Sequence, residues 1–339
     1  MDGLPWRWLW TATLASCLIP IAAAGTDPAG LLGPAEAKAW LARIQTAAAT
    51  GNYQGTMVFS TGATMSSSRV WHYTSGGQTW EHLEAMDGRQ ERIVRHNDAV
   101  HTLWPQSRVA VVERRDALTA WSTTPQRVEV QALDQYDLRA EGTSRVAGRE
   151  AAVLLLEPRD TLRYALRLWA DQASGLLLRA DVLGAASPRA VLESTAFSEV
   201  DIGQKPPPDG ISQTMQVLGK LDGYRVLRPQ QQQTTLEAEG WTLSRGVAGF
   251  RQVGCVRRGI GIVGEESPVL QAVYTDGLTV VSLFVELFKP ERHRSEQQLQ
   301  QGATATWMLR RGEHWITVVG DVPMATLRQF ADALERRKP

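Results

Sequence analysis

The 339-residue sequence is poor in cysteine: of Cys17 and Cys255, only Cys255 lies beyond the apolar N-terminal segment. A cleaved chain therefore has no intrachain disulfide and depends on its hydrophobic core, which a chain of this length can build. We expect Cys255 to be a small buried apolar residue rather than a reactive thiol. Net charge is also absent, because 36 Lys and Arg balance 36 Asp and Glu. This balance gives no overall attraction to nucleic acid, which we do not expect as a partner.

Catalytic and cofactor motifs are missing as well. No G-x-S-x-G is present, and no two histidines have the close spacing of a metal site, so we expect the strand histidines to face solvent. Gly259 to Gly264, "GIGIVG", matches a dinucleotide fingerprint only in its letters, because Pro268 soon follows where a helix is required. We therefore predict no catalytic residue, cofactor or metal ligand. An exported hydrolase is a hypothesis without positive support.

The N-terminus has the pattern of a secretory signal peptide. Arg7 precedes an apolar run that ends in the small residues Ala22-Ala23-Ala24, so we predict cleavage near Ala24 and export from the cytoplasm. "LASC", ending at Cys17, also resembles a lipobox, which leaves lipidation of Cys17 as an alternative. No later segment reaches the roughly 20 apolar residues of a membrane span.

Hydrophobic periodicity predicts a mainly β protein of the α+β class. Residues 34–50 predict a helix that begins at a proline and is followed by glycine. Short alternating runs with turn signals between them then predict an antiparallel meander, and residues 164–184 a hairpin. Residues 149–158 are apolar on both faces, as in a strand covered on both sides, and the first helix is the candidate cover for one side. Residues 133–138 suggest a short helix.

A stiff, proline-rich passage, "GQKPPPDG" at 203–210, predicts a domain boundary. The polar passage 228–240 is expected to be loop, and residues from 241 onward again show strand patterns. The chain ends in an amphipathic helix within 321–337, with Asp321 as its expected cap. The predicted divisions are a signal peptide (1–24), a large domain (25–202), a linker (203–240) and a smaller C-terminal domain (241–339).

Two sets of residues are candidates for binding. Large apolar side chains alternate along the predicted strands and either fill a core or line a lipid groove. The groove candidates are Met57, Phe59, Trp71, Tyr73, Trp104 and Trp169. From residue 220 onward the chain carries 16 Lys and Arg against 13 Asp and Glu, and its arginine pairs are candidates for docking an acidic partner segment. These are Arg257, Arg258, Arg310 and Arg311.

Several stretches, in order, resemble the MucB/RseB family. They include "YALRLWADQASGLLLRADVLG" (164–184), "NYQGTMVFS" (52–60), "YTDGLTVVSLFVE" (274–286) and "ITVVGDVPMATLRQFADAL" (316–334). The 164–184 hairpin also resembles that of the LolA/LolB lipoprotein carriers, which lack a second domain. A lipoprotein or lipid carrier is therefore the alternative function.

The resemblance to MucB/RseB implies a fold and a function. The implied fold is a large, unclosed antiparallel β-barrel with helices, similar to LolA, followed by a smaller antiparallel sheet domain with a terminal helix. The implied function is that of a periplasmic protein that negatively regulates the sigma-E envelope stress response. The C-terminal domain would bind the periplasmic domain of a membrane-anchored anti-sigma factor of the RseA/MucA type and shield it from site-1 proteolysis. Lipid or lipopolysaccharide would release it. A homodimer is a further possibility.

Overall fold

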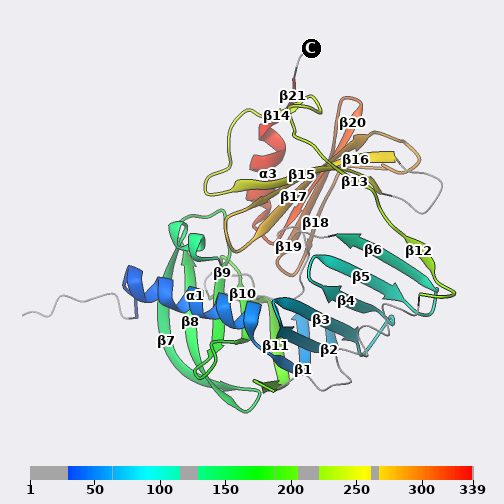
Figure 1. The fold of residues 1–339 in the computed structure, drawn as a ribbon. Coiled ribbons are helices and arrows are strands. Elements are labelled where there is room, and N and C mark those ends of the chain that lie inside the picture. The colour runs from blue at the N-terminus through cyan, green and yellow to red at the C-terminus, as the bar shows by residue number, and fades with distance from the viewer. Residues whose placement is uncertain are drawn as a thin grey trace, which may run out of the picture.

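The computed structural model describes residues 30–62, 64–114, 129–186, 188–204, 221–260 and 267–337. Two mainly antiparallel sheets dominate, the larger formed mostly by the first half of the chain and the smaller by the second (Figure 1). We call the larger sheet with its helices the N-terminal domain, and the smaller sheet with its helix the C-terminal domain. The predicted signal peptide, including Cys17, lies outside the described residues.

Twelve of the described strands form the larger sheet, in the order β12-β6-β5-β4-β3-β2-β1-β11-β10-β9-β8-β7. Their bounds are β1 (Tyr53–Thr61), β2 (Thr64–Ser75), β3 (Gln78–Ala85), β4 (Arg92–His96), β5 (Ala99–Trp104), β6 (Val109–Arg114), β7 (Tyr136–Val146), β8 (Arg149–Pro158), β9 (Ala165–Asp171), β10 (Leu177–Leu183), β11 (Val191–Ile202) and β12 (Arg225–Leu227). Strands β7 and β12 are the two edges, so this sheet does not close into a barrel. The unclosed fold predicted from the sequence is confirmed.

The predicted meander is present, because β1 to β6 pair consecutively and antiparallel. Two-residue turns suit the twist of such hairpins when both residues have positive φ. Gly76 and Gly77, between β2 and β3, have φ of 57° and 75°. The predicted 164–184 hairpin is also present, as β9 paired with β10.

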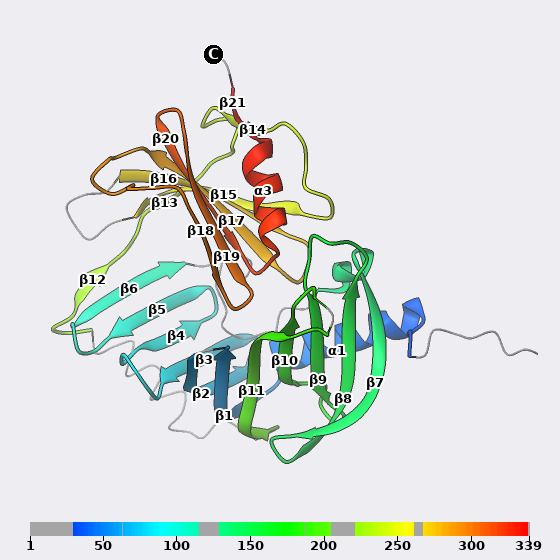
Figure 2. The same cartoon turned by 180° about the vertical axis from the view of Figure 1, so that it is seen from behind.

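The predicted first helix is α1 (Pro34–Thr50), which lies across β7 to β10 (Figures 1 and 2). Its buried stripe includes Leu41 and Ile44, neither of which has exposed surface. They share one core cluster with Leu154 of β8 and Leu168 of β9. This packing covers one face of β8, as the sequence predicted.

The short helix predicted at 133–138 is wrong in position. A 3-10 helix, η1 (Val130–Asp134), comes earlier, and Tyr136 already begins β7. Pairing explains the difference, since β7 is held along its length by β8. The alternating Tyr136 and Leu138 are both buried as strand residues.

Seven strands of the described residues form the smaller sheet, in the order β13-β15-β16-β17-β20-β19-β18. Their bounds are β13 (Gln231–Gln233), β15 (Arg251–Ile260), β16 (Ser267–Thr275), β17 (Val280–Leu287), β18 (Gln297–Gln301), β19 (Thr304–Arg311) and β20 (His314–Gly320). The polar passage predicted as loop is therefore wrong at β13, because main-chain pairing with β15 needs no apolar side chain. Part of "GIGIVG", residues 261–264, lies outside the described residues.

The terminal helix is shorter than predicted: α3 (Met324–Ala333) gives way to β21 (Leu334–Arg336), which pairs with β14 (Trp241–Leu243). Asp321 does not cap it. Its Oδ1 instead accepts a hydrogen bond from Thr304 Oγ1 at 2.6 Å, and burial raises the pKa of the Asp321 carboxyl.

The passage predicted as linker is partly structural. β12 pairs in parallel with β6 of the larger sheet, and β13 belongs to the smaller one. Leu221 and Tyr224 pack against Val94 and Leu103. The chain therefore crosses between the domains while remaining attached to both sheets. The boundaries at 202 and 241 stay predictions.

Candidate ligand-binding and partner-binding sites

The six predicted groove residues do not share one surface. We call the sheet face that α1 covers the α1 face. The pairing register of the strands places Met57, Phe59 and Trp104 on this face. The same register assigns the remaining three to the opposite face: Trp71, Tyr73 and Trp169. Met57, Tyr73 and Trp169 are buried, whereas the other three are half-buried. By register, three of the six candidates lie on each face, although Met57 and Trp169 belong to the same buried cluster.

The opposite face carries stacked aromatic and histidine rings. Trp71 stacks on His82 with 4.8 Å between ring centroids, and Trp80 stacks on His96 at 5.3 Å. Within the described part of the chain, Trp80 Nε1, His82 Nε2 and His101 Nδ1 are buried without a hydrogen-bond partner. Burial lowers the pKa of His82 and His101, which favours neutral rings. The prediction that the strand histidines face solvent is wrong for these ring atoms.

His72, on the α1 face, is buried as well, with 2% of its surface exposed. Its Nδ1 lies 2.6 Å from the carbonyl oxygen of Gly51, and its ring stacks on Tyr53 at 4.8 Å. Burial lowers the pKa of His72, although Glu81, whose Oε1 lies 3.6 Å from Nε2, acts in the other direction. This contact ties the end of α1 to β1 and β2.

A pocket of about 410 Å³ opens at the same end of α1. Its apolar wall includes Tyr53, Leu176 and Ile202, while Arg43 and Ser174 contribute polar atoms. Arg43 donates a hydrogen bond to the backbone oxygen of Gln172, which anchors α1 to the turn between β9 and β10. The pocket has an apolar interior with few polar groups, as small-ligand sites commonly do.

The four predicted partner-binding arginines also lie on different parts of the smaller sheet. Arg257 and Arg258 are neighbours on β15, and Arg310 and Arg311 are neighbours on β19, so each pair points to both faces of the smaller sheet. Arg257 Nη1 lies 3.5 Å from Glu239 Oε2. Arg310 lies over the Phe288 ring at 4.0 Å, and Arg311 donates to the Leu334 oxygen. They do not form one basic patch, and their docking role stays a prediction.

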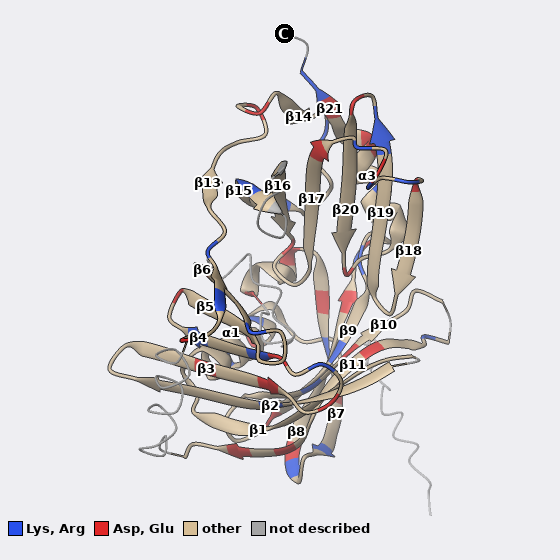
Figure 3. Cartoon of the chain, turned by 90° about the vertical axis from the view of Figure 1, so that its right-hand side faces the viewer, with Lys and Arg blue, Asp and Glu red and all other residues tan. Residues whose placement is uncertain are grey.

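Charge is mixed over both domains. Figure 3 shows basic and acidic residues side by side on the strands rather than a face of one sign. Among the described residues, no group of three or more His, Cys, Asp or Glu could hold a metal ion. No helix among them is long and apolar enough to cross a membrane.

Cys255 has the environment that the sequence predicted. It is buried, with 4% of its surface exposed, in the core of the smaller sheet. Burial raises the pKa of its thiol to about 11, so the nucleophilic thiolate is rare at neutral pH.

The pocket and its neighbouring contacts were not predicted from the sequence. Arg43 and Ser174 are more than a hundred residues apart, and each is an ordinary polar residue where it occurs. Alternation along residues 53–60 predicts only a strand face for Tyr53 and does not reveal that its ring stacks on His72. Only the return of the β9–β10 turn to α1 brings these groups together.

Family models match both domains of the chain. A model described as the MucB/RseB N-terminal domain matches residues 36–216, and one described as the MucB/RseB C-terminal domain matches residues 235–335. The chain belongs to the MucB/RseB family. The resemblance seen in the sequence is thereby confirmed, together with a second domain that the carriers lack.

Similar proteins of this family are matched over nearly their whole length. The sigma factor AlgU regulatory protein MucB of Pseudomonas aeruginosa is 30% identical over 307 residues, 88% of this chain and 90% of that protein. The sigma-E factor regulatory protein RseB of Salmonella typhimurium is 24% identical over 331 residues, 97% of this chain and 98% of that protein. The solved Pseudomonas aeruginosa MucA/MucB complex superposes with a TM-score of 0.66 and 26% identity, covering 90% of this chain and 100% of that chain.

Membership of the MucB/RseB family answers the question of catalysis. These relatives are regulatory proteins rather than enzymes. The family therefore argues against the exported hydrolase, independently of any motif that the sequence lacks.

Proposed function

We propose that this protein is a periplasmic negative regulator of a sigma-E type envelope stress response. It binds the periplasmic domain of a membrane-anchored anti-sigma factor and shields that domain from the site-1 protease. Lipid or lipopolysaccharide bound to the N-terminal domain releases it. The protein thus acts by occlusion, without chemistry of its own.

The observation that carries this proposal is similarity across both domains to MucB, which has been solved in complex with MucA. A carrier function would need only the larger sheet, yet both family models match here. The mild basic excess after residue 220 also suits an acidic partner segment, mainly by speeding encounter.

Protease protection tests the proposal directly. The purified mature chain is mixed with the periplasmic domain of the organism's own anti-sigma factor, and cleavage by the site-1 protease is followed over time. If the bound form is not cut, a free concentration 100 times Kd slows cleavage about 100-fold. An unrelated substrate of the same protease serves as control and should be cut at its usual rate. Undiminished cleavage of the anti-sigma domain, despite saturating protein, would reject shielding.

The lipid part of the proposal predicts a difference between the two sheet faces. We assign the lipid to the α1 face because the pocket lies there, and we use the half-buried Trp104 of that face as its probe. Trp104→Ala is therefore expected to weaken lipopolysaccharide binding about tenfold, the scale of one large buried side chain.

Trp71→Ala is the matched control, since Trp71 is also half-buried and, like Trp104, has an exposed arginine over its ring, Arg69 at 5.9 Å, but lies on the opposite face. It should change lipid affinity less than threefold. Fluorescence titration with lipopolysaccharide measures both variants. The reverse ranking would move the lipid to the opposite face.

A further inference from the structure

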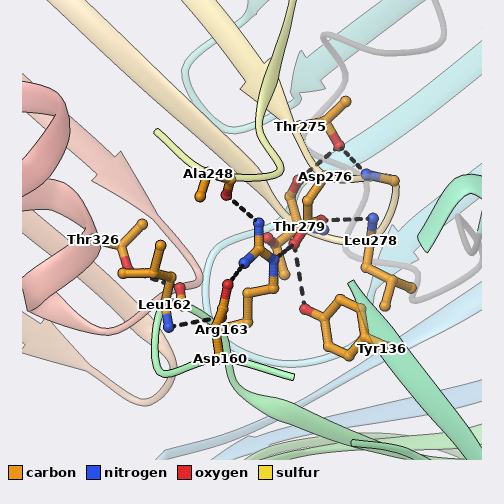
Figure 4. A network of polar contacts seen from close by, with 11 residues as sticks. Tyr136, Asp160, Leu162, Arg163, Ala248, Thr275, Asp276, Leu278, Thr279 and Thr326 are labelled. Atoms are coloured by element: carbon orange, nitrogen blue, oxygen red, sulfur yellow. Dashed lines mark hydrogen bonds and ion pairs between the residues drawn. The ribbon is translucent and has the colours of Figure 1, made fainter. Parts of the chain in front are cut away.

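The two domains meet at an ion pair with no exposed surface. Arg163 precedes β9 in the N-terminal domain, and Asp276 lies in the turn between β16 and β17 of the C-terminal domain. Arg163 Nε donates to Asp276 Oδ2 at 2.7 Å, and the side chains of both residues are 0% exposed. Tyr136, from the start of β7, donates its hydroxyl to the same oxygen at 3.3 Å (Figure 4).

Further contacts saturate the Arg163 guanidinium. Nη1 pairs with Asp160, and Nη2 donates to the backbone oxygen of Ala248 at 2.6 Å. The guanidinium also lies 4.8 Å from the centre of the Phe250 ring. Ala248 and Phe250 belong to the C-terminal domain, so this one side chain joins the two domains at several points.

Asp276 also holds its own turn together. Its Oδ1 accepts hydrogen bonds from the backbone N–H groups of Leu278 at 2.9 Å and Thr279 at 2.8 Å. One carboxylate oxygen therefore shapes the turn, while the other binds the opposite domain. An asparagine at position 276 can keep the first role and loses the charge that serves the second.

The backbone of the same turn packs against η1. Gly277 accepts a hydrogen bond from the N–H of Glu129 at 2.9 Å and has φ of +97°. A Cβ at Gly277 would lie 2.9 Å from the backbone nitrogen of Ala132. The turn therefore fits against η1 only because residue 277 has no side chain.

The contact between the Gly277 turn and η1 is connected to the pocket through packed secondary-structure elements. Ala132 of η1 belongs to the same buried cluster as Leu41 and Ile44 of α1, and α1 contacts η1 directly. The C-terminal half of α1 lines the pocket. A ligand that moves α1 therefore acts on the surface that carries Gly277 and Asp276.

Burial makes this contact sensitive to the loss of either charge. Both charges are hydrated when the domains separate, whereas in the closed arrangement Asp276 is neutralised by Arg163, and Arg163 by Asp276 and Asp160. Removing one partner therefore penalises the closed arrangement and leaves the open one almost unchanged. Coupling of two sites requires such an element, with two arrangements whose balance both ligands can shift.

We propose that Arg163 and Asp276 form a latch that holds the two domains in the arrangement seen here, and that opening it lowers the affinity of the C-terminal domain for its polypeptide partner. The second half of this proposal rests on the proposed function. Lipid on the N-terminal domain then releases the partner by moving α1 and η1 and opening the latch.

Distances between spin labels test the latch in the full mature chain. Labels at Met65→Cys and Leu287→Cys lie on different domains, at positions 75% and 61% exposed. The parent protein should give one narrow distance distribution. Arg163→Met should shift the ratio of closed to open forms about 10- to 100-fold toward open and broaden the distribution. Asp276→Asn should do the same with its turn preserved.

Arg167→Met is the matched control, because Arg167 of β9 forms a half-exposed ion pair with Glu141 of β7 inside the N-terminal domain. It should leave the distances unchanged. Tyr136→Phe removes only one hydroxyl and is a milder variant for the case that the charge variants fold poorly. It should shift the ratio of closed to open forms in the same direction, but less. The double variant Arg163→Met/Asp276→Asn should open the domains no further than the stronger single variant. Parental distances in folded Arg163→Met and Tyr136→Phe would overturn the latch.

Binding of the anti-sigma periplasmic domain, with and without lipopolysaccharide, tests the coupling. Folded Arg163→Met should bind about tenfold more weakly than the parent and respond less to lipopolysaccharide. Parental affinity in a variant whose domains are open would overturn the coupling while leaving the latch in place. If the parent itself binds no anti-sigma domain, the proposed function fails and the coupling with it, and the label distances still decide whether the latch exists.

Discussion

Replacing Phe330 with alanine is expected to lower the free energy of unfolding of the C-terminal domain by about 3–5 kcal/mol. Phe330 lies on α3 with no exposed surface. Its ring meets Phe250 edge-on at 5.4 Å and Tyr274 at 4.9 Å, and Leu283 of the sheet shares the same core cluster. Alanine leaves a cavity where α3 and the sheet meet, because neither element can collapse fully into it. Calorimetry and denaturant unfolding measure the effect.

Arg328→Ala is the matched control on the same helix. Arg328 is exposed, and its side chain donates to Gln298 Oε1 at 3.0 Å. Its loss should change stability by less than about 0.5 kcal/mol, as expected for a surface residue. Similar losses for the two variants would mean that α3 is held by its surface contacts rather than by its apolar stripe.

Replacing Leu168 with alanine is expected to destabilise the N-terminal domain by about 2–5 kcal/mol. Leu168 of β9 has no exposed surface and belongs to the cluster that joins the sheet to Leu41 and Ile44 of α1. The cavity would lie directly beneath the helix, so α1 should also become more mobile. Denaturant unfolding gives the stability, and hydrogen exchange of the α1 amides gives the local effect.

Leu166→Ala gives the comparison within the same strand and on the same face. Leu166 is only half-buried at the margin of that cluster. Leu166→Ala should therefore lower the free energy of unfolding by less than half as much as Leu168→Ala. Unchanged exchange along α1 in folded Leu168→Ala would contradict the view that this leucine anchors the helix. Because α1 contacts η1, Leu168→Ala should also weaken the contact between η1 and the Gly277 turn of the C-terminal domain.

Local sequence patterns were sufficient to predict most of the helices and strands. The alternation from Tyr53 to Arg114 predicted a meander, and the proline and apolar stripe at 34–50 predicted α1 with its bounds. These predictions succeeded because period and turn chemistry depend on residues a few positions apart. They failed at β13 and β21, where pairing with a distant strand outweighed a polar or helical local pattern.

The sequence by itself determined two antiparallel domains, the absence of a stabilising disulfide in a cleaved chain, and the family, since these follow from composition, periodicity and ordered motifs. Only the tertiary structure decided which apolar side chains share a face, because a sheet face is defined by register between strands. It likewise decided that Arg163 meets Asp276, 113 residues away. Neither residue is unusual in its own stretch, and their pairing exists only because the domains bury both charges in one contact.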